Sequence, residues 1–556
     1  MSYKAGRYLL PVLLIFGCTG IYHRYMPNYG GVVIPKKPGK YPKITQEDLL
    51  RGELNQFKSC YDVRYYDIDV SVDIKKHSIS GAVEFQTTVI QPLDTVQFDL
   101  SRKLKIDSII SDGRTVPFYR IKDAIFAIFP SQPANTDLDF TVKYGGKPQA
   151  AKNAPWDGGF VWSTDKAGNP WIGVACEGDG AMLWWPNKDH PSDEPDSVRI
   201  TIHCPSEFMA VSNGRLLETR EDPDGSTKAF QWIVNSPINN YNVTLYIGDY
   251  VVVPDTLQSG NGIHQINHYV LSYNQEIANS HFKQARDVLQ VFEKYFGEYP
   301  WWNDGYKLVE APYRGMEHQS AVAYGNGYLN NNNYYIYDLV DYIILHETAH
   351  KWWGNSITAC DGADIWLHEA FATYSEIIYL EEKLGRLISV DYLMNKRRYI
   401  RNELPMVGPR DVNYWGFDDV YWKGAWVLHT LRNAMNDDEM FFAVIREFQS
   451  RYKKSIVCTE DFINLVNEMT GIDYTYFFHQ YLYDRKPPIF QYSVDGDQFI
   501  YQWSGVQSDF HMPIYINVNE KQVWLTPTIE SKTAEIPEYA TIEIPDRYFY
   551  MVVEKK

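Results

Sequence analysis

The stretch LHETAHKWWGN at residues 345–355 places two histidines four residues apart, with a glutamate directly after the first. The surrounding apolar residues have helical spacing, so we expect His346 and His350 to project from one helix face and to share a metal ion. Glu347 points about 100° away from His346, which suits a carboxylate that takes a proton from an attacking water better than a third ligand. The pattern predicts a zinc site that performs hydrolysis.

A catalytic zinc site usually has three protein ligands and one open position. Eighteen residues separate His350 from Glu369, which lies in ADIWLHEAFATYSE, a second predicted helix that Asp364 could cap and Gly385 could end. Packing of the two helices would bring this carboxylate to the ion. Two structural histidines on one helix face are the alternative, and the glutamate at this spacing makes that alternative the weaker one.

The motif HExxH, followed by eighteen residues and a glutamate within WLHEAFATY, resembles the gluzincin aminopeptidases of the M1 metallopeptidase family, which includes aminopeptidase N and leukotriene hydrolase. The resemblance implies one Zn²⁺ per chain, held by His346, His350 and Glu369. It also implies hydrolysis of a peptide or amide bond, with Glu347 as the general base that passes its proton to the leaving amine.

The segment VYWKGAWVLHTLR resembles the family's YxKG segment, and this nominates Tyr421 as a hydrogen-bond donor to the oxyanion of the tetrahedral intermediate. The chain contains 43 tyrosines, so an incidental buried or surface tyrosine is a strong alternative at any one position. Lys423, Gly424 and the location after Glu369 favour the catalytic role.

Recognition of the free α-amino group separates an aminopeptidase from an endopeptidase. The segment YRGMEHQSAV (residues 313–322) resembles the family's GxMEN motif, which implies substrate contacts from Gly315, Met316, Glu317 and His318. Glu317 would pair with the substrate ammonium and fix its distance from the metal. The match departs from the motif twice, because a small residue before Met316 is missing and His318 replaces the asparagine. A surface loop with an incidental glutamate is the alternative.

In the resembling family, a second amine-binding side chain comes from the β domain, shortly before a DEP element. Residues 193–195 form this element here, and Glu177 precedes it where the family has Gln or Glu. The correspondence requires a short insertion at KDHP, so Asp179 is a rival, and a solvated acidic loop is the alternative. Two carboxylates aimed at an ammonium would also make the cleft negative and favour unblocked N-termini.

These residues leave other functions open. An endopeptidase of the wider HExxH class would not need Glu317 and would cut N-acetylated substrates equally well. A catalytically inactive peptide-binding lipoprotein would have lost a ligand or the base, whereas His346, Glu347, His350 and Glu369 are all present. Some relatives also hydrolyse a lipid epoxide, and nothing in this sequence argues specifically for that reaction. The expected partners are peptides with a free N-terminus.

The elements that must position these residues indicate a multidomain α+β protein. Short alternating runs closed by Gly, Pro, Asn or Asp predict an antiparallel, sandwich-like β domain at residues 51–272. Helical spacing begins near Asn274 and predicts a mainly helical domain at 273–488, which the resemblance implies is the thermolysin-like catalytic domain. Alternation returns after RKPP and predicts a small C-terminal β domain at 489–556.

The N-terminus resembles an export signal of the bacterial lipoprotein type. Lys4 and Arg7 precede a short apolar stretch that ends in Gly17-Cys18, too short to span a bilayer. We therefore expect a signal peptide at 1–18, lipidation of Cys18 and a location on a bacterial cell envelope, facing the periplasm or the surface. A Pro-, Gly- and Lys-rich segment at 19–50 is expected to be a tether. An uncleaved anchor or a plain signal is the alternative.

Charge and cysteine content limit other interpretations. The formal net charge is −17 and no Lys/Arg-rich stripe interrupts it, so nucleic acid is not an expected partner. The cysteines beyond Cys18 form no CxxC pair, and their disulfide state stays open; they are Cys60, Cys176, Cys204, Cys360 and Cys458. The sequence fixes neither the oligomeric state nor the preferred N-terminal residue of the substrate.

Overall fold

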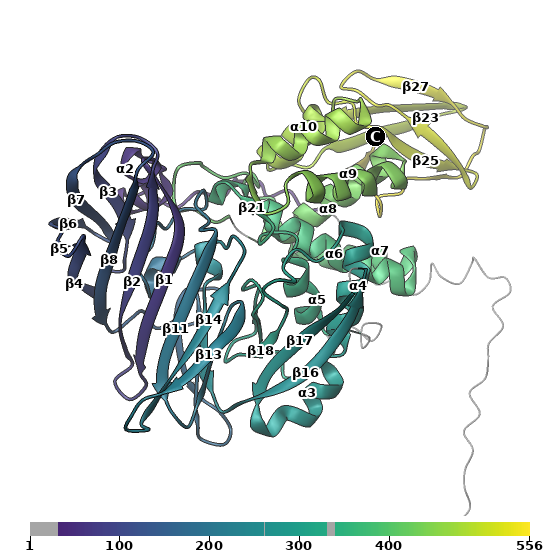
Figure 1. The fold of residues 1–556 in the computed structure, drawn as a ribbon. Helices are drawn as coiled ribbons and strands as arrows, with labels where there is room; N and C mark the ends of the chain where they lie inside the picture. Colours follow the sequence, from purple (N-terminus) through teal and green to yellow (C-terminus); the bar gives the residue numbers. More distant parts are fainter. Residues whose placement is uncertain (1–31, 261, 331–339, 417) are drawn as a thin grey trace, which may run out of the picture.

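The computed structural model describes residues 32–260, 262–330, 340–416 and 418–556. A β-rich unit lies beside a helical unit, and a smaller β unit packs on the helices at the C-terminal end (Figure 1). One continuous hydrophobic core runs through the helical unit and the C-terminal β unit, and a second core fills the N-terminal unit. This architecture confirms the predicted fold class.

The N-terminal unit is built around an eight-stranded sheet. Its strands alternate buried and exposed residues along much of their length, the pattern of a sheet with one face on a core. One pair, β1 with β11, runs parallel, so the sheet is mixed rather than purely antiparallel as expected. In spatial order the strands are β13 (Arg215–Glu221), β14 (Thr227–Val234), β11 (Ser197–Pro205), β1 (Tyr61–Asp73), β2 (Ser78–Val89), β8 (Asp137–Gly146), β4 (Leu104–Ser111) and β5 (Arg114–Thr115).

Two smaller sheets complete this unit. A three-stranded sheet contains β3 (Leu93–Asp99), β7 (Ala124–Gln132) and β6 (Phe118–Ile121). A four-stranded sheet contains β12 (Met209–Ser212), β15 (Leu245–Gly248), β10 (Pro170–Ala175) and β9 (Gly159–Thr164). Strand β10 ends two residues before Glu177, so the four-stranded sheet carries this carboxylate toward the helical unit.

A further sheet lies where the two units meet, around the predicted boundary at residue 273. Strands β16 (Tyr250–Ser259) and β17 (Gly262–Leu271) join a five-stranded sheet with β18 (Leu308–Glu310), β20 (Val322–Tyr324) and β19 (Gly315–Met316). Their apolar residues divide between the two cores, with Val253 and Ile266 in the core of the helical unit and Tyr250 and Leu271 in that of the N-terminal unit. This sheet therefore contributes side chains to both cores, and the predicted boundary at residue 273 stays a prediction.

Helices form the remainder of the second unit. The longest, α6, is almost entirely buried along its first four turns, which fits its place at the centre of the unit. The helices are α3 (Gln275–His281), α4 (Gln284–Phe296), α5 (Tyr342–Ala349), α6 (Trp366–Leu384), α7 (Arg386–Lys396), α8 (Asp419–Met435), α9 (Asp438–Arg451), α10 (Thr459–Thr470) and α11 (Thr475–Phe478).

A disulfide joins Cys360 to Cys458 beside the start of α6. It follows the parallel pair β21 (Ile357–Ala359) and β22 (Ser455–Val457), and so ties the segment before α6 to the start of α10. The other cysteines in the described part of the chain are buried free thiols. Sequence spacing alone did not identify this pair.

The C-terminal unit begins with β23 (Ile489–Asp495) and consists of two small sheets. One contains β27 (Lys532–Glu535), β24 (Gln498–Ser504), β23 and β29 (Val552–Lys555). The other contains β26 (Lys521–Leu525), β25 (Ile514–Val518) and β28 (Ile542–Glu543). The backbone N–H of Tyr550 donates to the Thr430 hydroxyl on α8 at 2.9 Å, one of the contacts that hold this unit to the helices.

The described part of the predicted tether lies on the folded body. The backbone carbonyls of Val33 and Pro35 accept hydrogen bonds from Asn402 and Arg485, and the Gly39 N–H donates to the carbonyl of Glu403. These bonds fasten this segment to the helical unit. Cys18 and the rest of the predicted signal and tether, up to residue 31, lie outside the described residues.

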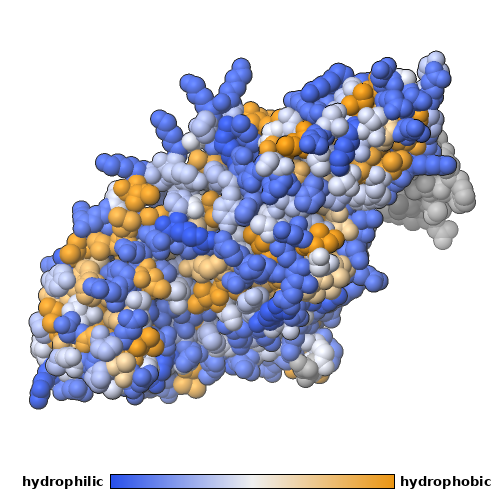
Figure 2. Space-filling view, turned by 90° about the horizontal axis from the view of Figure 1, so that it is seen from above, coloured by the Kyte–Doolittle hydropathy of each residue, from blue (hydrophilic) through white to orange (hydrophobic). Residues whose placement is uncertain are grey.

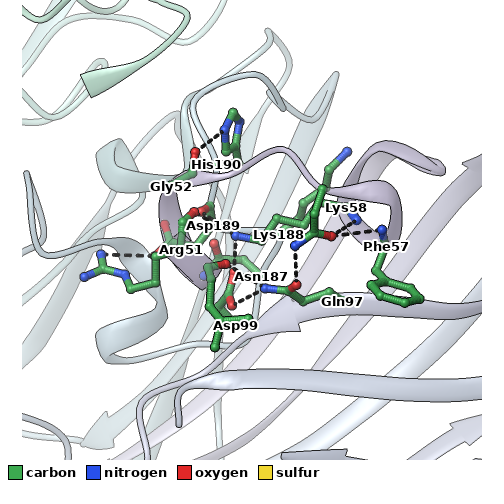
Figure 3. A network of polar contacts seen from close by, with 12 residues as sticks. Arg51, Gly52, Phe57, Lys58, Gln97, Asp99, Asn187, Lys188, Asp189 and His190 are labelled. Carbon is green, nitrogen blue, oxygen red and sulfur yellow. Dashed lines mark hydrogen bonds and ion pairs between the residues drawn. The ribbon is translucent and has the colours of Figure 1, made fainter. Parts of the chain in front are cut away.

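Helix α1 (Gln46–Gly52) then leads to the β unit, where its last residues take part in a network of polar contacts (Figure 3). Arg51 donates to the carbonyl of Asp179 at 2.6 Å, and His190 Nε2 lies 3.2 Å from the carbonyl oxygen of Gly52. Next to them, the fully buried pair Lys58 and Asp99 is 2.9 Å apart. Through the bond from Arg51 to Asp179, this network therefore fixes the loop that carries Glu177.

The surface in Figure 2 is mostly hydrophilic, with hydrophobic residues gathered in small groups. Exposed apolar side chains such as Trp156 and Tyr539 are scattered among several elements. Isolated apolar residues of this kind are ordinary on a folded domain. Within the described ranges, no helix has both the length and the apolar character that crossing a membrane requires.

Candidate active site

Helix α5 presents the two histidines as the sequence predicted. Its N-cap Asp341 accepts a hydrogen bond from the Ile343 N–H at 3.0 Å, which satisfies a free donor of the first turn. His346 lies in the last turn and His350 is the C-cap residue. Their Nε2 atoms are 3.2 Å apart, so both rings point at the same position.

Helix α6 brings Glu369 to the same position. Glu369 Oε2 lies 3.5 Å from His346 Nε2 and 3.6 Å from His350 Nε2. A tetrahedral zinc ion with ligands at about 2.0–2.1 Å separates them by about 3.3 Å, close to the three distances found here. Glu369 Oε2 is buried and accepts no hydrogen bond from the described residues. A buried carboxylate oxygen needs a partner, and a cation at the metal position would supply one. The three side chains fit Zn²⁺.

The far side of each imidazole has its own partner. Glu376 Oε1 lies 2.9 Å from His346 Nδ1, and the Trp353 carbonyl accepts from His350 Nδ1 at 2.8 Å. Protonated Nδ1 atoms leave both Nε2 lone pairs free for a metal. Tyr392 donates to the second oxygen of Glu376. Glu376 was not predicted, although its position seven residues after Glu369 places both on one face of α6.

Glu347 follows His346 on α5 and lines the cavity in front of the three ligands. Burial raises the pKa of Glu347 to about 8, with His346 lowering it and Glu317 and Glu369 raising it further. A dication beside the carboxylate would lower this pKa. A Cβ added at Gly315 would lie 2.5 Å from Glu347 Oε1, so the absence of a side chain at this glycine gives the carboxylate its space.

Tyr421 lies in the first turn of α8, with its ring centroid 6.2 Å from that of His346. Burial raises its pKa well above the ordinary value, and the carboxylates Glu369, Glu177 and Glu317 act in the same direction, so the phenol keeps its proton. The neighbouring residues of the YxKG segment position this helix. Lys423 donates to the carbonyl of Arg485 at 3.0 Å, and Gly424 lets α8 pack directly on Ala370 of α6.

Glu317 follows the short strand β19 and is held on a buried loop. The Tyr241 hydroxyl donates to Glu317 Oε1 at 3.0 Å, and Lys351 donates to the backbone carbonyl of Glu317 at 2.6 Å. One oxygen of Glu317 lies within 4.8 Å of ligand atoms of Glu347 and His350. Tyr241 was not predicted, since a tyrosine from the β unit carries no local sequence signal for this contact.

Glu177 lines the same cavity as Glu317. Burial raises the pKa of Glu177 well above its ordinary value, and the negative charge of Glu317, which lines the same cavity, is the next largest cause. The rival Asp179 points elsewhere, because its carboxylate accepts a hydrogen bond from the Gly158 N–H at 2.6 Å. The structure therefore brings together Glu177 and Glu317, and not Asp179.

The other residues of the 315–318 segment divide into two groups. Gly315 and Met316 line the cavity. His318 does not: its buried ring lies 2.7 Å from the Tyr246 hydroxyl, at the contact with the β unit. The expected contact between the His318 side chain and substrate is corrected accordingly, and this side chain supports the loop instead.

The resulting cavity has a volume of about 650 Å³ and lies between the β unit and the helices. The three metal-binding side chains line it, together with Glu347, Glu177 and Glu317. The lining also includes aromatic side chains from both units, namely Trp156, Tyr342, Tyr392, Tyr399, Trp415, Tyr421 and Trp422.

Comparison with known families matches both parts of the chain that form this cavity. Residues 63–241 match the Peptidase M1 N-terminal domain, and residues 280–481 match the Peptidase family M1 domain. The chain belongs to the M1 peptidase family. The predicted resemblance is thereby confirmed, whereas the bacterial lipoprotein form stays a prediction.

Among the relatives of this M1 peptidase, "Probable aminopeptidase 2" of Sulfurisphaera tokodaii is 21% identical over 493 residues, covering 81% of this chain and 60% of the relative. "Leucine aminopeptidase 2" of Lodderomyces elongisporus is 24% identical and is matched over 50% of its length. A solved M1 zinc metallopeptidase from Deinococcus radiodurans shares the fold, with a TM-score of 0.66, 21% identity and coverage of 81% of this chain and 97% of that one. This chain spans 60% or less of both curated relatives.

Proposed function

We propose that this M1 peptidase is a zinc-dependent aminopeptidase that hydrolyses the N-terminal peptide bond of peptides with a free N-terminus. One observation carries the proposal: two further carboxylates, Glu317 and Glu177, line the same cavity as the three-ligand site, and Glu317 lies beside Glu347 and His350. An ammonium group bound there would place the first peptide bond of the substrate over the metal position.

Zn²⁺ held by His346, His350 and Glu369 would, when bound, polarise the scissile carbonyl and acidify the attacking water. Glu347 takes a proton from this water as it attacks. The same carboxyl group then delivers the proton to the nitrogen of the leaving amine. Glu347 lines the cavity one residue after the metal ligand His346, and this location suits both proton transfers.

Tyr421 supplies a hydrogen bond to the oxygen that becomes negative during attack. Its phenol remains protonated, because burial and the surrounding carboxylates raise its pKa. A fixed neutral donor aimed at a developing charge stabilises the transition state more than the substrate.

Glu317 and Glu177 bind the substrate ammonium. The bond from Tyr241 to Glu317 Oε1 holds one carboxylate in place, so little ordering is needed when substrate binds. Charge-assisted contacts of this kind set both affinity and register. An acylated N-terminus offers these carboxylates no positive charge, and its binding would leave them buried without a cationic partner.

Variants of Glu317 test this proposal through the balance between KM and kcat. Glu317→Gln should raise KM for an unblocked peptide by ~10- to 100-fold and change kcat much less, since the ammonium contact exists before the reaction starts. Glu382→Gln, a surface change on α6, is the matched control. An unchanged KM in Glu317→Gln would show that the amino group binds elsewhere.

The alternatives have less support. An endopeptidase binds no free α-amino group in its active site and would not need the carboxylates of Glu317 and Glu177 there. A catalytically inactive binding protein has no need for Glu347 and Tyr421 beside a complete ligand set. Epoxide hydrolysis has no specific feature in its favour.

A location on the cell envelope, through lipid on Cys18, is part of the proposal. Its support is the sequence of residues 1–18 alone. Expression of the full chain in a bacterium with a lipoprotein pathway should give a membrane-bound product whose N-terminal peptide carries acyl mass. Cys18→Ala should release the protein from the membrane, and membrane association that survives this change would contradict lipid anchoring.

A further inference from the structure

Helix α1 lies outside both matched family domains, and its last turn lies next to the active site. Arg51 and Gly52 end this helix (Figure 3). Both line a small cavity of about 30 Å³, together with Tyr241 and Trp415. Trp415 also lines the active-site cavity, so this side chain lies between the end of α1 and the substrate. Membership of the family assigns no role to this helical turn.

Gly52 packs directly on the backbone that precedes Trp415. A Cβ at position 52 would lie 2.1 Å from the carbonyl carbon of Val412 and 2.4 Å from the nitrogen of Asn413, so this approach requires a glycine. The Asn413 N–H also donates to the carbonyl of Asp48 at 3.0 Å, one turn earlier on α1. Asn413 Oδ1 in turn accepts from Trp415 Nε1 at 3.1 Å. Helix α1 therefore positions both the backbone and the indole of Trp415.

Trp415 contacts the supports of both carboxylates that are proposed to bind the substrate ammonium. A Cβ at Gly178 would lie 3.6 Å from Trp415 Cγ, so the indole packs against the residue that follows Glu177. The indole also makes a T-shaped contact with the ring of Tyr241, with 6.0 Å between the centroids. The Tyr241 hydroxyl donates to Glu317 Oε1. A shift of Trp415 would therefore disturb the surroundings of both carboxylates.

Arg51 holds the Glu177 loop from the adjacent position on α1. Its Nη2 donates to the carbonyl of Asp179 at 2.6 Å and lies 3.7 Å from the Asp189 carboxylate. One helical turn thus contacts both the segment that carries Trp415 and the loop that carries Glu177. Because protein interiors are closely packed, displacement of this turn would have to move one of these segments.

We propose that Arg51 and Gly52 are positioning residues of the active site, which hold the Glu177 loop and Trp415 at the spacing that an N-terminal ammonium requires. The proposal rests on the aminopeptidase function proposed above. Neither residue is among the described residues that line the active-site cavity. Gly52 acts through Trp415, and Arg51 acts through the backbone of Asp179. Since the ammonium binds before the reaction starts, loss of this spacing should raise KM more than it lowers kcat.

Gly52→Ala tests the contact with the backbone of Val412 and Asn413. In zinc-loaded protein, KM for Ala-Ala-Ala should rise ~10- to 100-fold with little change in kcat, the cost of a displaced substrate contact. Zinc affinity should stay at the wild-type value, because the metal-binding side chains lie on α5 and α6. Gly260→Ala is the matched control, since its Cβ would meet no atom of the described residues within 4 Å. An unchanged KM in Gly52→Ala, or a loss in kcat alone, would overturn the proposal.

A double-mutant cycle with Trp415→Ala separates positioning from general destabilisation. If Gly52 acts through Trp415, Gly52→Ala should have little further effect on KM once the indole has been removed. The free-energy effects of the two changes should therefore sum to more than the effect of the double variant. Fully additive effects would show that Gly52 does not act through Trp415, and would contradict the proposal.

Arg51→Met is a second test that introduces no steric clash, and it decides the matter if Gly52→Ala does not fold. Loss of the bond to Asp179 should raise KM for Ala-Ala-Ala by ~10-fold, with wild-type zinc affinity and circular dichroism. Arg64→Met is the matched control, at a partly exposed arginine of β1 that pairs with Asp137. A wild-type KM in folded Arg51→Met would overturn the proposal.

Failure of the positioning role can be distinguished from failure of the proposed function. If Glu317→Gln raises KM whereas Gly52→Ala and Arg51→Met do not, the aminopeptidase proposal stands and α1 has no part in substrate binding. If no peptide loses its N-terminal residue in the wild type, the proposed function itself fails.

Discussion

Glu376 Oε1 lies 2.9 Å from His346 Nδ1, so a single helix supplies both a metal ligand and the carboxylate that orients another ligand. Glu369 and Glu376 are two turns apart on α6, which makes the spacing of the two carboxylates a property of the helix itself. The Tyr392 hydroxyl binds the other oxygen of Glu376 and restrains its rotation. Tyr392 therefore restrains Glu376, and Glu376 in turn orients the metal ligand His346.

Glu376→Gln should weaken zinc binding by ~10- to 100-fold, because the amide cannot stabilise the imidazole as the carboxylate does. Competition with a chromogenic chelator measures the affinity, and circular dichroism checks folding. Glu382→Gln, on the exposed side of the same helix, should retain wild-type affinity. A wild-type zinc affinity in Glu376→Gln would mean that this carboxylate does not tune the ligand.

Gly315→Ala should reduce kcat while zinc stays bound. The new Cβ would come within 2.5 Å of Glu347 Oε1 and 3.0 Å of Ile343, so the carboxylate has to move away from its place. Loss of a positioned general base costs ~10²- to 10⁴-fold, which sets the upper limit for this variant. Glu347→Ala provides that limit, and a Gly315→Ala enzyme with unchanged kcat would contradict the positioning role.

Tyr421→Phe should lower kcat by ~10²- to 10³-fold with little change in KM, since the phenol acts on charge that develops during the reaction. Steady-state kinetics on an unblocked peptide measure both constants. Tyr399→Phe, at another tyrosine of the cavity, is the matched control. An effect on KM alone would place Tyr421 in substrate binding.

The unfolding free energy should decrease as the pH falls, in part because of His268, a buried imidazole that is not a predicted metal ligand. Burial lowers its pKa to about 3, while Nδ1 accepts from the Leu308 N–H at 3.0 Å. The neutral form is native, so its full contribution is present above the unfolded pKa of about 6.5 and is lost as the pH falls toward 3. Between pH 7.5 and 5.0 this group alone costs about 2 kcal/mol of unfolding free energy.

His268→Asn keeps an acceptor for Leu308 and removes the titration. Urea unfolding at pH 7.5 and 5.0 should show a smaller loss of stability in this variant than in the wild type, whatever its absolute stability. Identical losses in both proteins would show that His268 does not drive the pH dependence.

Local periodicity predicted part of this site. The spacing of His346 and His350 depends only on helix geometry, and Glu369 follows from one packed helix pair. Glu376 had a similar signal in its spacing from Glu369. Tyr241 had none, because its contact with Glu317 depends on how two units meet.

Dependence on tertiary contacts also explains the other differences between the predictions from sequence and the structure. Strands β16 and β17 look like strands of the first unit alone, yet their side chains divide between the two cores, which no local pattern records. The segment from residue 32 has the composition of a tether, and its backbone is nevertheless held by Asn402 and Arg485, residues far along the chain. The pairing of Cys360 with Cys458 likewise depends on tertiary structure.

The most direct test of the account compares two peptides that differ only in N-acetylation, with zinc content measured on the same sample. The account predicts about one zinc per chain and release of the first residue from the free peptide alone. Equal cleavage of both peptides would contradict it, because the carboxylates Glu317 and Glu177 would then have no part in choosing the bond.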